Sequence, residues 1–375
     1  MTQMSEKREA LEHVGYPIEH NPLERHSNIG IILPGQDVRK IGMFEQIMES
    51  PAGREVLTRG NEWLKENYNY DLLEMAKEIP DESPEDRKNR ADILRQTKYT
   101  QPAVYLASMA LHNIKKHHER SPGYATTPDY ITGISMGMGT AAVLAGYMDF
   151  ETGLKFHAER GRIMQEESDP TPTSMVTLMG DEEKVNEYLK KPENAMLHLC
   201  IINADNLFVV GGPDDPSDPT SPMQRVRSEA KSAGFRRTME VDTDRAMHGR
   251  YVRPARESFD KLVDSIDFKK HHSIVVSSLT GEPIHNEEDM KNELKQGFDN
   301  TIDNRLPLKF FKERKIHVAS EVGSEKGFFA KFLGDHRVQA AAAIGAGVVA
   351  AGAVTAYEIM THHHPDHPEN GNKEE

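Results

Sequence analysis

The sequence predicts an α/β protein in which a smaller domain is inserted into a larger one. One observation is a short apolar strand that enters the turn Gly133-Ile134-Ser135-Met136-Gly137 and leaves it as a helix of small residues. Another is a compact block, residues 174–241, whose strands and helices follow in the order β-α-β-β-α-β. That order is the ferredoxin-like plan, whose ends come back together, so the block fits as an insertion within a longer domain.

The turn around Ser135 is the feature about which the larger domain is organised. Residues 130–132 end a buried strand, and the apolar spacing of residues 140–147 predicts a helix. A serine between two glycines at such a turn is the nucleophile elbow of α/β-hydrolase-like proteins, where a side chain at either glycine would crowd the turn. The following helix points its N-terminus at the serine, where free N–H groups can stabilise an oxyanion. Taken alone, the pattern also fits an ordinary glycine-rich turn.

Apolar periodicity predicts the other elements of the larger domain. Residues 28–33 form a buried first strand, which Pro34-Gly35-Gln36 ends at the edge where α/β sheets bind ligands. Residues 149–167 predict an amphipathic helix that carries Arg160, and residues 80–90 predict a charged, solvent-facing connection. Another helix is expected at 99–111, a further one at 254–263, and strands at 273–278 and 316–320.

These elements divide the chain into four parts. Residues 1–27 are polar and rich in glutamate, without the apolar core of a secretory signal, and are expected to be a mobile extension. The α/β-hydrolase-like large domain is expected at 28–172 and 244–335, the ferredoxin-like small domain at 173–243, and an Ala/Gly-rich helix with a polar, His-containing tail at 336–375.

Composition excludes several classes of function. The formal charge of -14 argues against a nucleic-acid partner, which would need a concentrated basic face. The one cysteine, Cys200, lies in the apolar run 197–202 and is expected to be a buried core thiol rather than a nucleophile. A single cysteine also excludes a disulfide within the chain.

Seven short motifs follow one another in a fixed order between residues 28 and 335. They are Leu33-Pro34-Gly35-Gln36, Thr100-Gln101-Pro102-Ala103, the turn at 133–137, Arg160-Gly161-Arg162-Ile163-Met164-Gln165, Ala246-Met247-His248 with Pro254-Ala255, Thr280-Gly281-Glu282-Pro283 and Glu321-Val322-Gly323. In kind and order they resemble the motifs of malonyl-CoA:acyl carrier protein transacylases and of the acyltransferase domains of polyketide synthases.

The resemblance implies a serine acyltransferase that needs no metal and no cofactor. Ser135 would be acylated, and His248 would take its proton because imidazole has a pKa near neutral pH. The N–H groups of Gln36 and Met136 would form the oxyanion hole. In the family a backbone carbonyl orients the histidine, and the matching stretch lies near residues 294–298.

Two more residues carry over by their place in the motifs. Arg160 would bind the free carboxylate of a malonyl-type group, since a guanidinium pairs with a carboxylate in bidentate geometry. Without the family context, a surface arginine paired with a glutamate would be the simpler interpretation. Asn203 matches an asparagine that lies close to the site in the family, although the loop after it is shorter here.

The implied substrates are malonyl-CoA, or a related acyl-CoA, and the phosphopantetheine thiol of an acyl carrier protein, in fatty acid or polyketide synthesis. Two alternatives stay open: a proofreading hydrolase of the same family, against which Arg160 argues, and a catalytically silent carrier-binding protein. The silent protein is motivated by Ile134 and Met138, which replace a histidine and a glutamate of the family pattern. Residues 245–248 match neither the malonyl nor the methylmalonyl pattern, so the preferred acyl group stays open.

Residues 338–357 form an Ala/Gly/Val run that only Gln339 and Thr355 interrupt. At about 1.5 Å per residue, the run is long enough for a helix to cross the roughly 30 Å core of a bilayer. Lys331 and Arg337 precede it, which would keep the rest of the chain on the cytoplasmic side. A cytoplasmic protein with a C-terminal anchor is therefore one expectation, and a helix docked on its own domain or a loosely ordered tail is the other.

Overall fold

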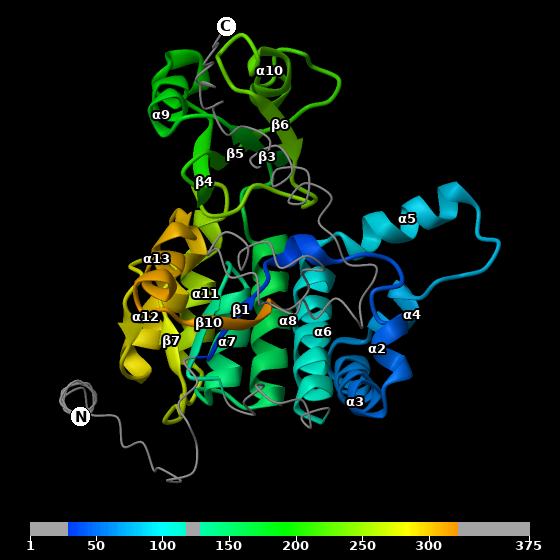
Figure 1. Ribbon diagram of the computed structural model, residues 1–375. Coiled ribbons are helices and arrows are strands. Elements are labelled where there is room, and N and C mark those ends of the chain that lie inside the picture. The colour runs from blue at the N-terminus through cyan, green and yellow to red at the C-terminus, as the bar shows by residue number, and fades with distance from the viewer. Residues whose placement is uncertain (1–28, 118–127, 322–375) are drawn as a thin grey trace, which may run out of the picture.

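The computed structural model describes residues 29–117 and 128–321. Two units are stacked in it, each built on its own five-stranded sheet, with the smaller unit above the larger in Figure 1. Helix α5 projects from the side of the larger unit in the same view. The protein is thus a mixed α/β structure, as the sequence predicts.

The sheet of the larger unit has the strand order β10-β1-β2-β7-β8. Its first four strands are parallel to their neighbours, and β8 is antiparallel to β7. The strands are β1 (Ile29–Leu33), β2 (Tyr130–Gly133), β7 (Ile274–Val276), β8 (Pro283–Ile284) and β10 (His317–Glu321). All five residues of β1 are buried, as a parallel strand covered on both faces requires.

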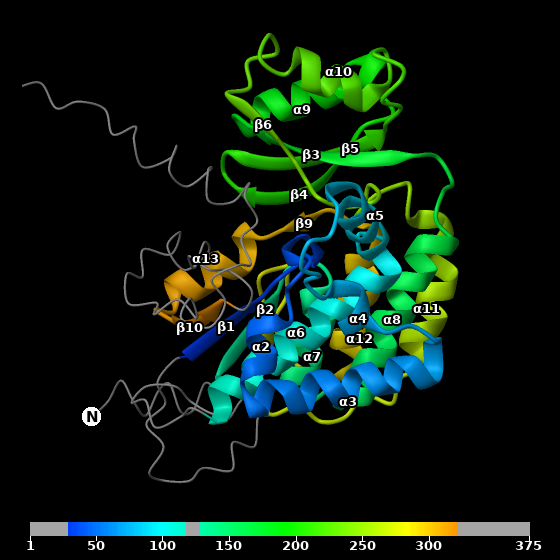
Figure 2. The ribbon, with the colours of Figure 1, turned by 90° about the vertical axis from the view of Figure 1, so that its right-hand side faces the viewer.

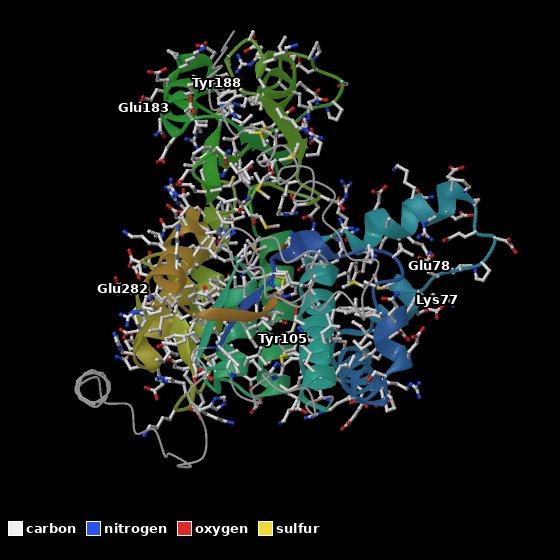
Figure 3. The ribbon with its side chains drawn as sticks, in the orientation of Figure 1. Lys77, Glu78, Tyr105, Glu183, Tyr188 and Glu282 are labelled. Carbon is white, nitrogen blue, oxygen red and sulfur yellow. The ribbon has the colours of Figure 1, made fainter. Side chains whose placement is uncertain are left out.

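Helices surround this sheet and contribute most of the larger core. They are α2 (Glu45–Glu49), α3 (Pro51–Tyr68), α4 (Leu72–Ala76), α5 (Pro84–Leu94), α6 (Thr97–His117), α7 (Gly137–Ala145), α8 (Phe150–Glu166), α11 (Arg256–Asp264), α12 (Glu287–Asp299) and α13 (Arg305–Glu313), with the 3-10 helices η1 (Gln36–Val38) and η3 (Arg253–Ala255). The fully buried Tyr105 lies inside this unit, where its hydroxyl donates to the carbonyl of Phe150 at 2.8 Å (Figure 3). A Cβ on Gly161 would lie 2.7 Å from the carbonyl oxygen of Thr97, so α8 can approach α6 this closely only at a glycine.

The sheet of the smaller unit has the order β6-β3-β5-β4-β9. Its elements are β3 (Thr173–Met179), α9 (Glu182–Lys190), η2 (Pro192–Asn194), β4 (His198–Ala204), β5 (Leu207–Pro213), α10 (Pro222–Glu229), β6 (Arg237–Glu240) and β9 (Ile302–Asp303). Figure 2 shows α9 and α10 on the face of this sheet that points away from the larger unit. Val176, Phe208 and Val226 belong to a separate core beneath these two helices.

Strand β9 joins the smaller sheet although it comes from the stretch expected in the large domain. Ile302 and Asp303 pair in parallel with Ile201 and Ile202 of β4, and the N–H of Asn304 donates to the carbonyl of Ile202 at 2.9 Å. The late part of the chain therefore ties the two units together. The domain bounds remain a prediction. Strand β9 falls within the range predicted for the large domain, yet it pairs in the sheet of the smaller unit.

The expectation of a connection at 80–90 is wrong, because most of that stretch belongs to helix α5. Ser83 caps the helix by accepting a hydrogen bond from the N–H of Asp86, and Pro84 occupies the first turn. Lys88 and Asp92 form an i, i+4 ion pair at 2.6 Å. An apolar stripe could not signal this helix because Leu94 is its only buried residue.

Candidate active site

Ser135 lies in the sharp turn between β2 and α7, with a left-handed backbone at φ 53°. This conformation is uncommon for a residue with a side chain. A Cβ on Gly133 would lie 2.1 Å from the carbonyl carbon of Gly137, and a Cβ on Gly137 would lie 2.6 Å from the carbonyl oxygen of Leu33. Only glycine fits at either position, so the backbone of the turn has the geometry of a nucleophile elbow.

His248 reaches Ser135 from a separate loop and also has a left-handed backbone, at φ 55°. Its Nε2 lies 2.7 Å from the Oγ of Ser135, and its Nδ1 lies 3.0 Å from the carbonyl oxygen of Gly297 on α12. A carbonyl can only accept, so Nδ1 carries the hydrogen and Nε2 is free to accept the serine proton. The orienting carbonyl falls within the stretch near 294–298 that the family resemblance implies.

Burial keeps the His248 imidazole neutral. Desolvation, and after it the charge of Arg160, lower its pKa to about 3, although the hydrogen bond to Gly297 acts in the opposite direction. At neutral pH the ring is therefore a free base, as the acceptor of a serine proton must be.

Two chain segments that begin helices lie beside the serine. Gln36 opens η1 after β1, and Met136 is the N-cap of α7. The first N–H groups of a helix have no partner inside it and can donate to an anion. The N–H of Ile134 donates to the carbonyl of Leu33 at 2.9 Å, which holds the two segments together. The Gln36 side chain is fixed by the amide of Gln101, whose Nε2 lies 3.3 Å from its Oε1.

Arg160 is a buried cation for which the described residues provide no counterion. The side chain is on α8 and only 4% exposed, and its Nη1 has no hydrogen-bond partner within residues 29–117 and 128–321. Its guanidinium carbon lies 6.0 Å from the ring centre of Phe298, next to Gly297, and its charge lowers the pKa of His248. Burial lowers the pKa of Arg160 itself to about 10, which still leaves it charged at neutral pH. Buried charges are normally paired, so this site is suited to an anionic group.

Asn203 is the predicted site residue whose contacts lie elsewhere. On β4 its Oδ1 accepts a hydrogen bond from the amide of Asn304 at 2.8 Å. In the part of the chain that the structure describes, it makes no hydrogen bond to Ser135, His248 or Arg160. Sequence reasoning assigned no role to Gln101, although this residue stands in one of the seven motifs.

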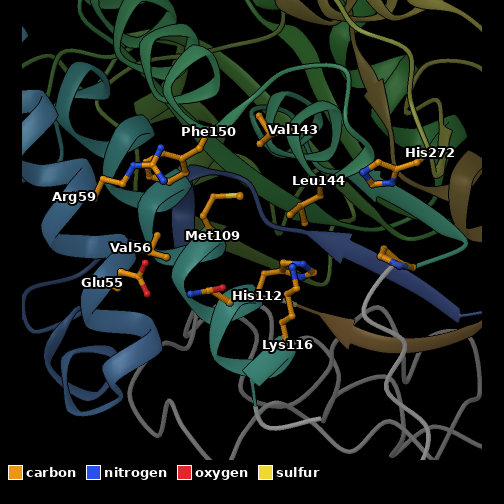
Figure 4. A pocket seen from close by; sticks show the side chains of 12 residues that line it. Glu55, Val56, Arg59, Met109, His112, Lys116, Val143, Leu144, Phe150 and His272 are labelled. Carbon is orange, nitrogen blue, oxygen red and sulfur yellow. The ribbon is translucent and has the colours of Figure 1, made fainter.

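A separate cavity of about 340 Å³ lies near the other end of α7, between α3, α6 and α7 (Figure 4). It is lined by Val56 of α3, His112 of α6, Leu144 of α7 and others, and by none of the predicted site residues. The cavity therefore has no part in the arrangement around Ser135. Within the described ranges, no group of three or more His, Cys, Asp or Glu side chains is placed to hold a metal ion. Cys200 is fully buried, which confirms it as a core thiol, and burial raises its pKa.

The family model for the acyl transferase domain matches residues 31–316. The chain belongs to this family. The family predicted from the ordered motifs is therefore confirmed.

Over the aligned residues, related proteins are about a quarter identical in sequence to this acyl transferase domain. The mitochondrial malonyl-CoA-acyl carrier protein transacylase of Mus musculus is 27% identical over 262 residues, which cover 67% of this chain and 63% of the relative. The polyketide biosynthesis malonyl CoA-acyl carrier protein transacylase PksC of Bacillus subtilis is 26% identical over 256 residues, 68% of this chain and 79% of the relative. The chain thus spans less than two thirds of the mouse protein, and 28% of another relative, the polyketide biosynthesis protein PksE of Bacillus subtilis.

Solved structures share the fold. A malonyl-transacylase in complex with its type II polyketide synthase acyl-carrier protein has a TM-score of 0.69 at 21% identity, covering 88% of this chain and 99% of that one. The malonyl-CoA:acyl carrier protein transacylase of Helicobacter pylori has a TM-score of 0.67 at 22% identity, covering 89% and 98%. The arrangement of two stacked units is therefore that of the malonyl transacylases.

Proposed function

We propose that the protein moves a malonyl-type acyl group from coenzyme A to the phosphopantetheine thiol of an acyl carrier protein, through an ester on Ser135. The observation that carries the proposal is the buried guanidinium of Arg160, whose Nη1 has no partner among the described residues, beside a hydrogen-bonded Ser135–His248 pair. A serine and its base serve many acyl transfers, whereas a buried cation without a partner suits an acyl group that ends in a carboxylate.

The reaction would take place in two matched halves. His248 Nε2 accepts the Ser135 proton while Oγ attacks the thioester carbonyl, and the N–H groups of Gln36 and Met136 receive the oxyanion. The intermediate collapses, the C–S bond breaks, and the imidazolium returns the proton to the departing thiolate of coenzyme A. In the second half His248 takes the proton of the carrier thiol, whose sulfur attacks the ester. Oγ then leaves as the serine hydroxyl and recovers the proton.

The same proposal extends to the fold in finer detail. The larger unit, with a serine at a strand-to-helix turn of a mostly parallel sheet, would be α/β-hydrolase-like. The smaller unit would be ferredoxin-like, supported by its strand order β6-β3-β5-β4 and by α9 and α10, which connect β3 to β4 and β5 to β6. Its bounds, 173–243, are those of the sequence analysis.

Intact-protein mass spectrometry after incubation with malonyl-CoA tests the function. We expect one malonyl group on the peptide that contains Ser135, its loss when holo-acyl carrier protein is added, and none in Ser135→Ala. A protein that takes no malonyl group contradicts the proposal.

The same experiment separates the alternatives. A proofreading hydrolase would release the acyl group to water as fast without carrier protein as with it. A silent binding protein would take no label, yet its affinity for the carrier would survive Ser135→Ala. Arg160 favours the transferase over the hydrolase, because a hydrolase of mixed acyl chains gains nothing from a carboxylate clamp.

The predicted anchor, residues 338–357, lies outside the described residues and stays a prediction, as does a cytoplasmic location. Among the helices of the described residues, none has the length and apolar character needed to cross a bilayer. Fractionation of cells that express the full chain, or a chain stopped at Gly334, tests the tail. If both proteins are found in the soluble fraction, the anchor is excluded.

A further inference from the structure

The loop that carries His248 is held from the smaller unit. His248 has a left-handed backbone at φ 55°, a conformation that costs a side-chain-bearing residue on the order of 1 kcal/mol and persists only where neighbours fix it. The hydrogen bonds of the His248 ring go to Ser135 and Gly297, both outside the smaller sheet. The backbone of its loop is contacted from β3, where the N–H groups of Ala246 and Met247 donate to Thr173 Oγ1 at 2.8 Å and to Met175 Sδ at 3.5 Å, and from β4.

His198 of β4 contacts the residue before His248. Its Nε2 lies 3.3 Å from the carbonyl oxygen of Met247, and because a carbonyl only accepts, this nitrogen carries the hydrogen. The Sγ of Cys200 lies 3.3 Å from the same nitrogen. Nδ1 is buried without a partner among the described residues, which suits a neutral ring. Burial lowers the pKa of His198 to about 4, so the ring is neutral at physiological pH.

The same ring also contacts the residue after His248. A Cβ on Gly249 would lie 2.0 Å from Cδ2 of His198 and 2.1 Å from its Nε2, so the imidazole lies directly against the Gly249 backbone. A second tie lies close by: the Tyr251 hydroxyl donates to the carbonyl of Met196 at 2.8 Å, and its ring centre is 5.5 Å from that of His198. His198 thus contacts both sequence neighbours of His248, one by a hydrogen bond and one by packing.

We propose that His198 is a positioning residue: its Nε2–H bond to Met247, with its ring against Gly249, holds the His248 backbone in the conformation that aims Nε2 at Ser135. His198 touches neither the serine nor Arg160, and it acts only through the loop. The smaller unit therefore supplies contacts that position His248, and the larger unit supplies the nucleophile Ser135. The expected change in acylation rate rests on the proposed function, whereas the expected change in the position of the His248 ring rests on geometry alone.

Two variants of matched size separate the hydrogen bond from packing. His198→Gln places an amide N–H near the position of Nε2, whereas His198→Met fills a similar volume without a donor. In the full chain labelled with ¹⁵N-histidine, the Nδ1–H signal of His248, assigned by its loss in His248→Gln, reports the bond to Gly297. We expect this signal to shift or broaden in His198→Met and to persist in His198→Gln.

Single-turnover acylation by malonyl-CoA gives the kinetic readout. We expect His198→Met to lower the acylation rate about tenfold with KM changed less than about twofold, because only the alignment of the base is altered. His198→Gln should restore most of the rate. Should His198→Met fail to fold, His198→Asn replaces it, because its amide ends at the position of Nδ1, short of Met247.

The outcomes divide cleanly. A parent-like His248 signal in His198→Met overturns the inference, and so does an equal loss in His198→Met and His198→Gln, which would indicate packing alone. If the parent takes no malonyl group, the proposed function fails instead, and the His248 signal still decides the role of His198.

Discussion

His248 and Arg160 lie in neighbouring parts of one site, and both are almost fully buried, yet their polar atoms are satisfied to opposite degrees. Both ring nitrogens of His248 have partners, at 2.7 Å from Ser135 and 3.0 Å from the Gly297 carbonyl. Among the described residues, Nη1 of Arg160 is buried without a hydrogen-bond partner, and the guanidinium carbon lies 6.0 Å from the ring centre of Phe298. One region is complete without a ligand, and the other is not.

The difference teaches which part of the reaction each region serves. A base must be aligned before the substrate arrives, and a network with every polar atom paired is rigid. A buried guanidinium without an anion is destabilising until a carboxylate pairs with it. In the proposed reaction, the His248 region would provide chemistry common to any acyl group, and the Arg160 region would provide the choice among acyl groups.

Removal of the pair should have the largest effect. We expect Ser135→Ala and His248→Ala each to lower the acylation rate by roughly 10³-fold or more for malonyl and acetyl groups alike, since both steps need the serine and its base. Stopped-flow acylation with both thioesters measures this. Ser228→Ala is the control, because this exposed hydroxyl bonds only to carbonyls of its own helix.

Loss of the Arg160 cation should affect malonyl transfer more than acetyl transfer, whereas loss of the Ser135–His248 pair should affect both alike. Arg160→Ala should weaken malonyl transfer relative to acetyl transfer by about 2 to 3 kcal/mol, because a buried charge-assisted pair is lost for one substrate only. The ratio of kcat/KM for the two thioesters gives this value. Arg162→Ala, two residues along the same helix and paired with Glu159, is the matched control. An equal loss for both acyl groups would refute the clamp.

The same position should show that the unpaired charge is destabilising. Arg160→Met keeps apolar volume and removes the buried cation, so we expect it to raise the free energy of unfolding by about 1 to 2 kcal/mol while it impairs malonyl transfer. Urea denaturation of the parent and the variant measures the difference. A variant less stable than the parent would mean that the guanidinium has favourable contacts in the free protein.

The two regions should also be coupled through pH. Because the pKa of His248 is lowered to about 3, the free base persists far below the usual value of about 6.5, and the acid limb of acetyl transfer should lie well below pH 6. The Arg160 charge contributes to that lowering, so Arg160→Met should move the acid limb to higher pH by a fraction of a unit. A limb near pH 6.5 in the parent would contradict the buried, neutral base.

Stability should follow the same titration with a defined sign. Between pH 6.5 and 3 the unfolded chain binds a proton at His248 and the folded protein does not, so the stability it contributes is present above pH 6.5 and is lost as pH falls below that value. Each such histidine contributes roughly 1.4 kcal/mol per pH unit at most. Unfolding midpoints at a series of pH values, for the parent and His248→Gln, isolate this contribution.

Local signals made much of this site predictable. The Ser135 turn is specified partly by adjacent residues, because a Cβ on Gly133 would meet the backbone of Gly137 and Met138, whereas a Cβ on Gly137 would meet Leu33 and Pro34, about a hundred positions earlier. The orienting atom of His248 could be placed only within a stretch, since Gly297 contributes a backbone carbonyl that has no side-chain signature. That Nη1 of Arg160 has no partner within the described part of the chain depends on what packs around α8, which a sequence pattern does not record.

The misses have the same physical origin. Helix α5 is stabilised by its cap and ion pairs rather than by an apolar face, so periodicity could not find it. Strand β9 has two residues, too few for any alternation, and its pairing with β4 joins positions about a hundred residues apart. The contacts of His198 with the loop at 247–249 are equally non-local.

The Gly297 carbonyl has one further consequence, for the lifetime of the ester. A carbonyl is a dipole and stabilises an imidazolium less than a full carboxylate charge would, so the Ser135–His248 pair contains a base of limited strength. Thiols have a pKa near 8.5 and water has one near 15.7, so deprotonation of water needs a much stronger base than deprotonation of a thiol. In the proposed reaction the acceptor is thus selected by its acidity. The acyl group would then survive contact with solvent and leave when a thiol enters.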